Sequence, residues 1–129
     1  MLPGEEDGRF RILIVDDDRD IRELLGELLT DEGFEIEAAW NGAEALKRLR
    51  AGFRPHVIIL DLMMPVMDGV ELIRRLRENS LTAEIPVVAI TADATSQAEA
   101  RAREAGAADF ITKPIDLPAL LERLRAFQH

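Results

Sequence analysis

Cysteine is absent from this chain of 129 residues, which excludes disulfide bonds, thiol catalysis and thiolate metal sites. No apolar run approaches the ~20 residues that a membrane-spanning helix needs. The sequence contains neither GxGxxG nor GxxxxGK[ST], so the common phosphate-binding loops are missing. Its first ten residues, MLPGEEDGRF, lack the basic and apolar segments of a secretory signal. These absences predict a soluble, cytoplasmic domain that does not enter a membrane.

Positive charge is also scarce. The chain has 16 Lys and Arg against 25 Asp and Glu, a formal net charge of -9. Nucleic acid and anionic lipid would repel such a chain, so we expect neither as a direct partner. The length and the 47% share of hydrophobic residues suit one globular domain. We predict a flexible N-terminal lead at residues 1–9 and the domain at residues 10–129.

Short apolar runs alternate with amphipathic segments along the chain. Strands are predicted at residues 11–15, 34–39, 56–60, 85–90 and 108–112. Helices are predicted at residues 20–33, 41–52, 68–80, 94–106 and 116–127, with N-caps at Asp18, Asn41, Asp68 and Asp116. Near-continuous apolar strands that alternate with helices predict an α/β fold with a five-stranded, doubly wound parallel sheet.

Polar side chains follow several of these strands. In a doubly wound sheet, ligands bind outside the carboxyl ends of the strands. Acids follow the first and third strands, a hydroxyl follows the fourth, and a lysine and a proline follow the fifth: Asp16, Asp17, Asp61, Thr91, Lys113 and Pro114. We expect these side chains to converge at one edge of the sheet.

The acids in this group predict a cation. If Asp16, Asp17 and Asp61 lie about 5 Å apart, each pair repels by about 3 kcal/mol at an effective dielectric constant near 20. Either a carboxylate takes up a proton or a cation binds. Oxygen ligands alone favour Mg²⁺, and a cation beside a lysine and a hydroxyl is typical of phosphoryl transfer. Asp61, alone at its strand end, is the candidate nucleophile, and Asp16 and Asp17 are the candidate metal ligands.

Four segments of the chain resemble the response-regulator receiver domain of two-component signalling: ILIVDDD, DLMMPVMDG, ITADA and AGAADFITKPI. The resemblance covers about residues 11–127. It implies a flavodoxin-like fold of the chemotaxis-regulator type, with strand order 2-1-3-4-5 and five helices.

The resemblance also implies residue roles around a metal. Asp61 would accept a phosphoryl group from a histidine kinase or a histidine phosphotransfer protein. Asp16, Asp17 and Asp61 would hold Mg²⁺, with Mn²⁺ as a substitute, and Met63 would add its backbone carbonyl. The domain would be an enzyme only in a limited sense, because it would catalyse the phosphorylation and dephosphorylation of its own aspartate.

The other implied roles concern switching. Lys113 would pair with a phosphoryl oxygen, and the Lys113–Pro114 bond would be cis. Thr91 would bond the phosphoryl group and move toward it, while Phe110 would rotate inward. Met63 and Asp93 flank the site. Our hypothesis is that Met63 restricts the approach of water and that Asp93 either orients water or repels anionic donors.

Partners follow from this mechanism. We expect a histidine-bearing helix to dock on the apolar residues of the first helix and on the loop after Lys113: Ile21, Leu24, Leu25, Pro114 and Ile115. The output would be read on the face formed by the helix at 94–106, the strand at 108–112 and the helix at 116–127. A downstream protein or a second copy of the chain would bind that face.

Two alternatives use the same fold or chemistry. A phosphatase of the haloacid-dehalogenase type needs a second acid two residues after its nucleophile, and Met63 stands there. The other alternative is a phosphorylation-independent interaction or docking module with a receiver fold. A complete set of acid, hydroxyl and lysine positions argues against that module without excluding it. The kinase, the stimulus and the output do not follow from the sequence.

Overall fold

The computed structural model describes residues 9–64 and 67–128. Pro65 and almost all of the predicted lead lie outside these ranges. Five parallel strands form one sheet in the order β2-β1-β3-β4-β5. The strands are β1 (Arg11–Val15), β2 (Glu35–Ala39), β3 (Val57–Asp61), β4 (Val87–Thr91) and β5 (Asp109–Thr112). The flavodoxin-like strand order is thereby confirmed.

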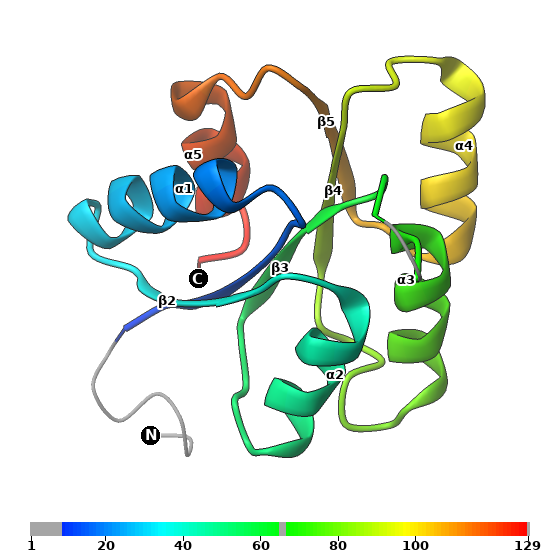
Figure 1. Cartoon of the computed structure of the whole chain (residues 1–129), viewed down its shortest axis with the longest axis horizontal. Helices are drawn as coiled ribbons and strands as arrows, with labels where there is room; N and C mark the ends of the chain where they lie inside the picture. The colour runs from blue at the N-terminus through cyan, green and yellow to red at the C-terminus, as the bar shows by residue number, and fades with distance from the viewer. Residues whose placement is uncertain (1–8, 65–66, 129) are drawn as a thin grey trace.

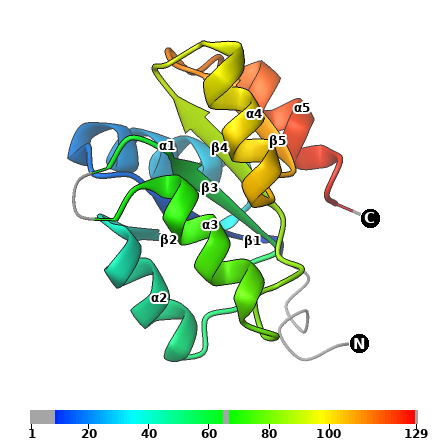
Figure 2. The same ribbon diagram turned by 90° about the vertical axis from the view of Figure 1, so that its right-hand side faces the viewer.

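Five helices cover this sheet in the described part of the chain. They are α1 (Arg19–Asp31), α2 (Gly42–Arg50), α3 (Gly69–Glu78), α4 (Ser96–Ala105) and α5 (Leu117–Arg125). Helices α1 and α5 cover one face, and α2, α3 and α4 cover the other (Figure 1). Figure 2 shows α2, α3 and α4 in succession across their face. No helix among the described residues is both long and apolar enough to cross a bilayer.

The sheet separates two hydrophobic cores. Side chains alternate between the faces of a strand, so Ile12 and Ile14 of β1 pack with α1 and α5. Leu13 and Val15 pack on the opposite face with residues of α2, α3 and α4. All four side chains are fully buried. This two-sided burial explains why the strands read as continuous apolar runs.

Helix starts follow the predicted capping chemistry at three positions. The side chains of Asp18, Asn41 and Asp68 each accept a hydrogen bond from a backbone N–H in the first turn of α1, α2 and α3. Asp116 is also an N-cap residue, but its side chain makes no capping hydrogen bond. Pro118 lies in that first turn and has no N–H to donate.

The central strands run one residue further than predicted, to Asp61 and Thr91. Asp61 is still aligned with Ile90 in the sheet, and the Leu62 N–H donates to the Ile90 carbonyl over 2.9 Å. The sheet itself therefore fixes the backbone of the acid and of the hydroxyl residue. Such rigid backbone positions hold a reactive side chain better than a loop does.

Candidate functional site

Three carboxylates meet at the carboxyl ends of β1 and β3. Oxygens of Asp16, Asp17 and Asp61 all lie within 4.8 Å of one another. Asp16 is 3% exposed and Asp61 is 4% exposed, whereas Asp17 is open to solvent. Two buried acids beside an exposed third form a site that is held by protein on one side and reachable from solvent on the other.

Lys113 joins the two buried carboxylates. Its Nζ lies 3.2 Å from Asp16 Oδ2 and 3.2 Å from Asp61 Oδ2. The Lys113 backbone N–H donates to the Thr91 carbonyl over 2.8 Å, which fixes the start of this loop beside β4. The Lys113–Pro114 peptide bond is cis, as the resemblance implied.

Burial and charge alter the protonation of this pair. Burial, with a smaller contribution from the nearby Asp16 carboxylate, raises the pKa of Asp61 to about 6. The Met63 N–H and Lys113 oppose that rise. Burial alone would lower the pKa of Lys113, but Asp16 and Asp61 outweigh it and the pKa is raised. Lys113 is therefore held as a cation, and Asp61 is an ionised but poorly solvated carboxylate at neutral pH.

Backbone donors hold the carboxylates in place. The Met63 N–H donates to Asp61 Oδ1 over 2.9 Å, and the Asp18 N–H donates to Asp16 Oδ1 over 2.8 Å. The Arg22 guanidinium donates to the Asp16 carbonyl oxygen over 2.8 Å. Each buried acid thus keeps one oxygen on the backbone and turns the other toward Lys113. This arrangement orients the acids before any ligand arrives.

Thr91 supplies a buried hydroxyl at the end of β4, next to the end of β3. Its Oγ1 accepts a hydrogen bond from the Asp93 N–H over 3.1 Å, so the hydroxyl proton stays available for another acceptor. Asp93 Oδ1 in turn accepts from the Thr95 N–H over 3.0 Å. Asp93 is exposed and is held by the turn before α4.

Met63 follows Asp61 closely and gives the site a solvent-exposed side chain. Met63 is 61% exposed, although Met64 beside it is buried. Further along the chain, Gly69 lies so close to β3 that a Cβ would stand 2.6 Å from Leu62 Cα and 2.9 Å from the Asp61 carbonyl oxygen. Only glycine allows α3 to begin this close to the end of β3.

Phe110 does not lie with the acids. It stands opposite Ala89 in the sheet and is buried in the core beneath α2, α3 and α4. The ring is already inside in this structure. Thr91, in contrast, lies at the site edge, one residue beyond Ile90.

An apolar groove of about 580 Å³ adjoins Lys113. It brings together the residues predicted for partner docking, and Leu28, Ala92 and Leu117 complete its lining with Ile21, Leu24, Leu25, Pro114 and Ile115. Leu24 is 56% exposed, whereas Leu25 is 4% exposed and belongs to the core. Leu24 is therefore the side chain of this pair that a partner can contact.

Arg22 and Gly69 are site residues that the sequence reasoning missed. Arg22 acts through a backbone carbonyl, which no residue pattern reveals. One sequence feature could have indicated Gly69. It directly follows the Asp68 cap, at a first helical position where a residue with higher helix propensity would be expected.

The donor set suits a hard divalent cation. Three carboxylate oxygens within 4.8 Å of one another, one of them on solvent-exposed Asp17, match the ligands and the retained waters of Mg²⁺. No sulfur or imidazole ligand is among them, which disfavours a softer metal.

Comparison with known proteins agrees with this geometry. Residues 12–125 match the family model of the response regulator receiver domain. The chain is 42% identical over 117 residues to the response regulator MprA of Mycobacterium avium (strain 104), covering 91% of this chain and 50% of that protein. The same regulator from Mycobacterium sp. (strain KMS) is 43% identical over 116 residues, or 90% of this chain and 49% of that protein. The chain thus spans about half the length of these curated relatives.

Solved structures give the same result. Chemotaxis protein CheY4 of Vibrio cholerae superposes with a TM-score of 0.87 at 32% identity, covering 92% of this chain and 98% of that one. The signal receiver domain of a signal transduction histidine kinase from Syntrophus aciditrophicus superposes with a TM-score of 0.82 at 36% identity, covering 92% and 89%. This chain therefore belongs to the response-regulator receiver domain family.

Proposed function

We propose that this receiver domain accepts a phosphoryl group on Asp61 from a phosphohistidine of a histidine kinase or phosphotransfer protein. The observation that carries the proposal is the pair of 3.2 Å contacts by which one lysine amine joins Asp61 and Asp16. That arrangement leaves an acid buried, oriented and next to a fixed cation. It suits a nucleophile that must meet a highly charged donor.

In the proposed reaction, an oxygen of Asp61 forms a bond to phosphorus while the bond from phosphorus to the donor histidine nitrogen breaks. Lys113 turns from the carboxylate to a phosphoryl oxygen and offsets its charge. Thr91 donates its free hydroxyl proton to another phosphoryl oxygen. Hydrolysis later returns Asp61 by the attack of water on phosphorus, so the domain acts catalytically only on itself.

Asp16, Asp17 and Asp61 would hold Mg²⁺, and the Met63 carbonyl is the proposed fourth protein ligand. The ion, when bound, supplies positive charge for the phosphoryl oxygens and neutralises the mutual repulsion of the acids. Mn²⁺, which prefers the same oxygen ligands, is the expected substitute.

The kinase or phosphotransfer helix would dock in the apolar groove beside Lys113. Leu24 offers an exposed apolar contact there, and Pro114 and Ile115 follow the lysine directly. Docking at this point puts the donor histidine next to Asp61. Such donors receive their phosphoryl group from ATP, which is found in the cytoplasm. We therefore expect the domain to act there.

The α4-β5-α5 face is the proposed output surface. Asp109 of β5 pairs with Arg123 of α5 and lies 3.7 Å from Arg103 of α4. One carboxylate thus links both helices, and a shift of Phe110 on the same strand would disturb it. Phosphorylation would move the population between two arrangements of this face, which a downstream protein or a second copy would read.

Intact mass after incubation with Mg²⁺ and a small acyl phosphate tests the chemistry. We expect one phosphoryl adduct that requires Mg²⁺, is labile to base and is absent from Asp61→Asn. The matched control is Asp31→Asn, which removes an exposed acid of the same type at the far end of α1 and should keep the adduct.

A missing adduct has two readings that a second measurement separates. If beryllofluoride still binds with Mg²⁺, hydrolysis outruns accumulation and the proposal holds. If neither the adduct nor beryllofluoride binding occurs, the domain is a phosphorylation-independent docking module.

A further inference from the structure

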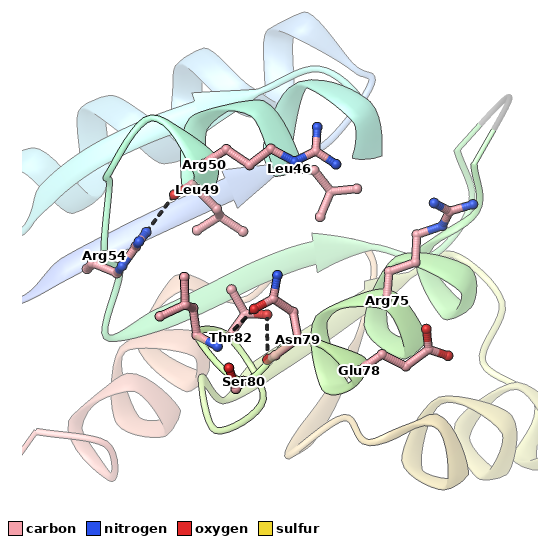
Figure 3. A pocket seen from close by; sticks show the side chains of 10 residues that line it. Leu46, Leu49, Arg50, Arg54, Arg75, Glu78, Asn79, Ser80 and Thr82 are labelled. Atoms are coloured by element: carbon pink, nitrogen blue, oxygen red, sulfur yellow. Dashed lines mark hydrogen bonds between the residues drawn. The ribbon is translucent and has the colours of Figure 1, made fainter.

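A second hollow lies at the opposite edge of the sheet from Asp61. The C-terminal ends of α2 and α3 and the loops that follow them enclose about 540 Å³. A volume of this size falls within the range of small-molecule sites, roughly 300–1,000 Å³. Figure 3 shows the hollow with its lining side chains.

Three arginines surround this space: Arg50 of α2, Arg54 of the following loop and Arg75 of α3. Glu78 is the one carboxylate among its lining residues as the structure describes them. The hollow therefore carries net positive charge on a chain whose formal net charge is -9. Arg50 and Arg75 stand in the last turns of α2 and α3, where the helix dipole favours cations.

The arginine side chains also keep N–H groups that can donate hydrogen bonds to a ligand. Among the described residues, the Arg50 side chain has no hydrogen-bond or ion-pair partner. Arg54 donates from one nitrogen to the Leu49 and Phe53 carbonyls, which fixes its position, and no carboxylate in the described part of the chain pairs with it. Arg75 pairs with Glu71 at 3.3 Å on the exposed surface, a weak interaction in water.

The remaining lining is apolar or neutral. Leu46, Leu49 and Leu81 supply apolar surface, and Leu81 is 66% exposed. Asn79 and Ser80 add neutral polar groups from the loop after α3. Arginines beside a leucine surface suit a ligand with a multiply charged oxyanion at one end and an apolar or aromatic group at the other, because a guanidinium binds phosphate oxygens through two parallel hydrogen bonds.

We propose that this hollow binds an organic phosphate of nucleotide size. The phosphate oxygens lie on Arg50, Arg54 and Arg75, and the apolar portion covers Leu46 and Leu81. The site is independent of the Asp61 centre, since it lies at the amino ends of the strands and needs no metal.

The test is an amide NMR titration of the full chain with ADP and, in parallel, with inorganic pyrophosphate. EDTA removes Mg²⁺, so phosphates cannot bind at the Asp61 centre through a metal. About 0.15 M salt screens loose attraction to surface charges. We expect saturable shifts confined to the end of α2 and the loop after α3, with ADP binding more tightly than pyrophosphate.

Arg50→Gln is the variant, because its side chain is exposed and bonds to nothing that folding needs. Losing one charged hydrogen-bond donor should weaken ADP binding about tenfold. Arg101→Gln removes the same charge from exposed α4 and should change the affinity less than twofold, about the error of such a comparison.

Three results would overturn the proposal. The first is the absence of saturable shifts with either probe. The second is equal weakening by both variants, which would indicate general charge attraction only. The third is pyrophosphate binding as tightly as ADP, which would show that the organic part of the ligand contributes nothing to binding.

Discussion

Lys113 Nζ lies 3.2 Å from Asp61 Oδ2, although 52 positions separate the two residues in the sequence. The same amine is equally far from Asp16. The lysine thus supplies, from a fixed stem, the positive charge that the two buried acids require. A metal ion at the acids would share them with this amine.

This shared position predicts competition between Lys113 and Mg²⁺. Lys113→Gln should raise the affinity for Mg²⁺ about tenfold, because it removes a positive charge close to the metal ligands. Isothermal titration calorimetry measures the change. Lys47→Gln, which removes an exposed lysine of α2, is the control and should leave the affinity unchanged. Unchanged or weaker binding in Lys113→Gln would contradict the prediction.

Burial of Asp61 predicts a gain in stability for Asp61→Asn. The pKa of Asp61 rises from 3.8 to about 6 on folding, so the folded state holds this proton more tightly than the unfolded chain. The carboxylate therefore lowers the free energy of unfolding as pH rises through that window, and the loss persists at neutral pH. Without Mg²⁺ at pH about 7.5, Asn should be more stable by about 1–3 kcal/mol.

Urea unfolding at two pH values measures this effect. The advantage of Asp61→Asn should shrink as pH falls below 6 and approach zero only near pH ~3, below both pKa values, where both states of the wild type bind the proton. Asp93→Asn, which changes an exposed acid, is measured beside it as the control. A wild type that is the more stable protein at neutral pH would refute the explanation.

The exposure of Met63 leads to a prediction about the lifetime of the proposed phosphorylated form. Met63 is 61% exposed at the mouth, so Met63→Asn should bring a polar amide to the path of water and speed hydrolysis about threefold or more. Asp93→Ala should have the smaller effect, because its carboxylate is already engaged by the Thr95 N–H. The decay of the phosphoryl adduct after removal of the donor gives both rates. Identical lifetimes in all three proteins would disprove the hypothesis.

Glycine-to-alanine substitutions at two positions should have opposite effects on the stability of the fold. Gly69→Ala would put a Cβ 2.6 Å from Leu62 Cα, so it should destabilise the fold by more than about 2 kcal/mol and displace the Asp61 strand end. Gly26 lies inside α1 and would meet nothing closer than 4.0 Å. Gly26→Ala should stabilise by about 0.5–1 kcal/mol. Thermal unfolding compares the two, and equal effects would show that the close approach is not rigid.

Residue patterns predicted the order and type of every element because the strands are short apolar runs, whereas the helices carry apolar residues at helical spacing. The ends of β3 and β4 were wrong by one residue, since Asp61 and Thr91 are polar but remain in the hydrogen-bonded sheet. Asp116 was predicted to cap α5, yet its side chain makes no capping bond. Local chemistry indicates a cap position without guaranteeing the rotamer that completes it.

The carboxylate cluster was predictable because parallel strands bring their carboxyl ends to one edge. The arginine hollow was not, since it depends on how the ends of α2 and α3 meet. Arg75 belongs to a stretch that in sequence resembles an ordinary solvated helix face. Contacts through the backbone, such as Arg22 with the Asp16 carbonyl, are likewise invisible to side-chain patterns.

The division of the interior into two cores has an evolutionary consequence. Side chains beneath α1 and α5 support the groove beside Lys113, and Phe110 lies in the core beneath α2, α3 and α4. Substitutions that share no contacts combine almost additively. Substitutions in the two cores should therefore accumulate independently during evolution, because the sheet keeps the side chains of one core away from those of the other.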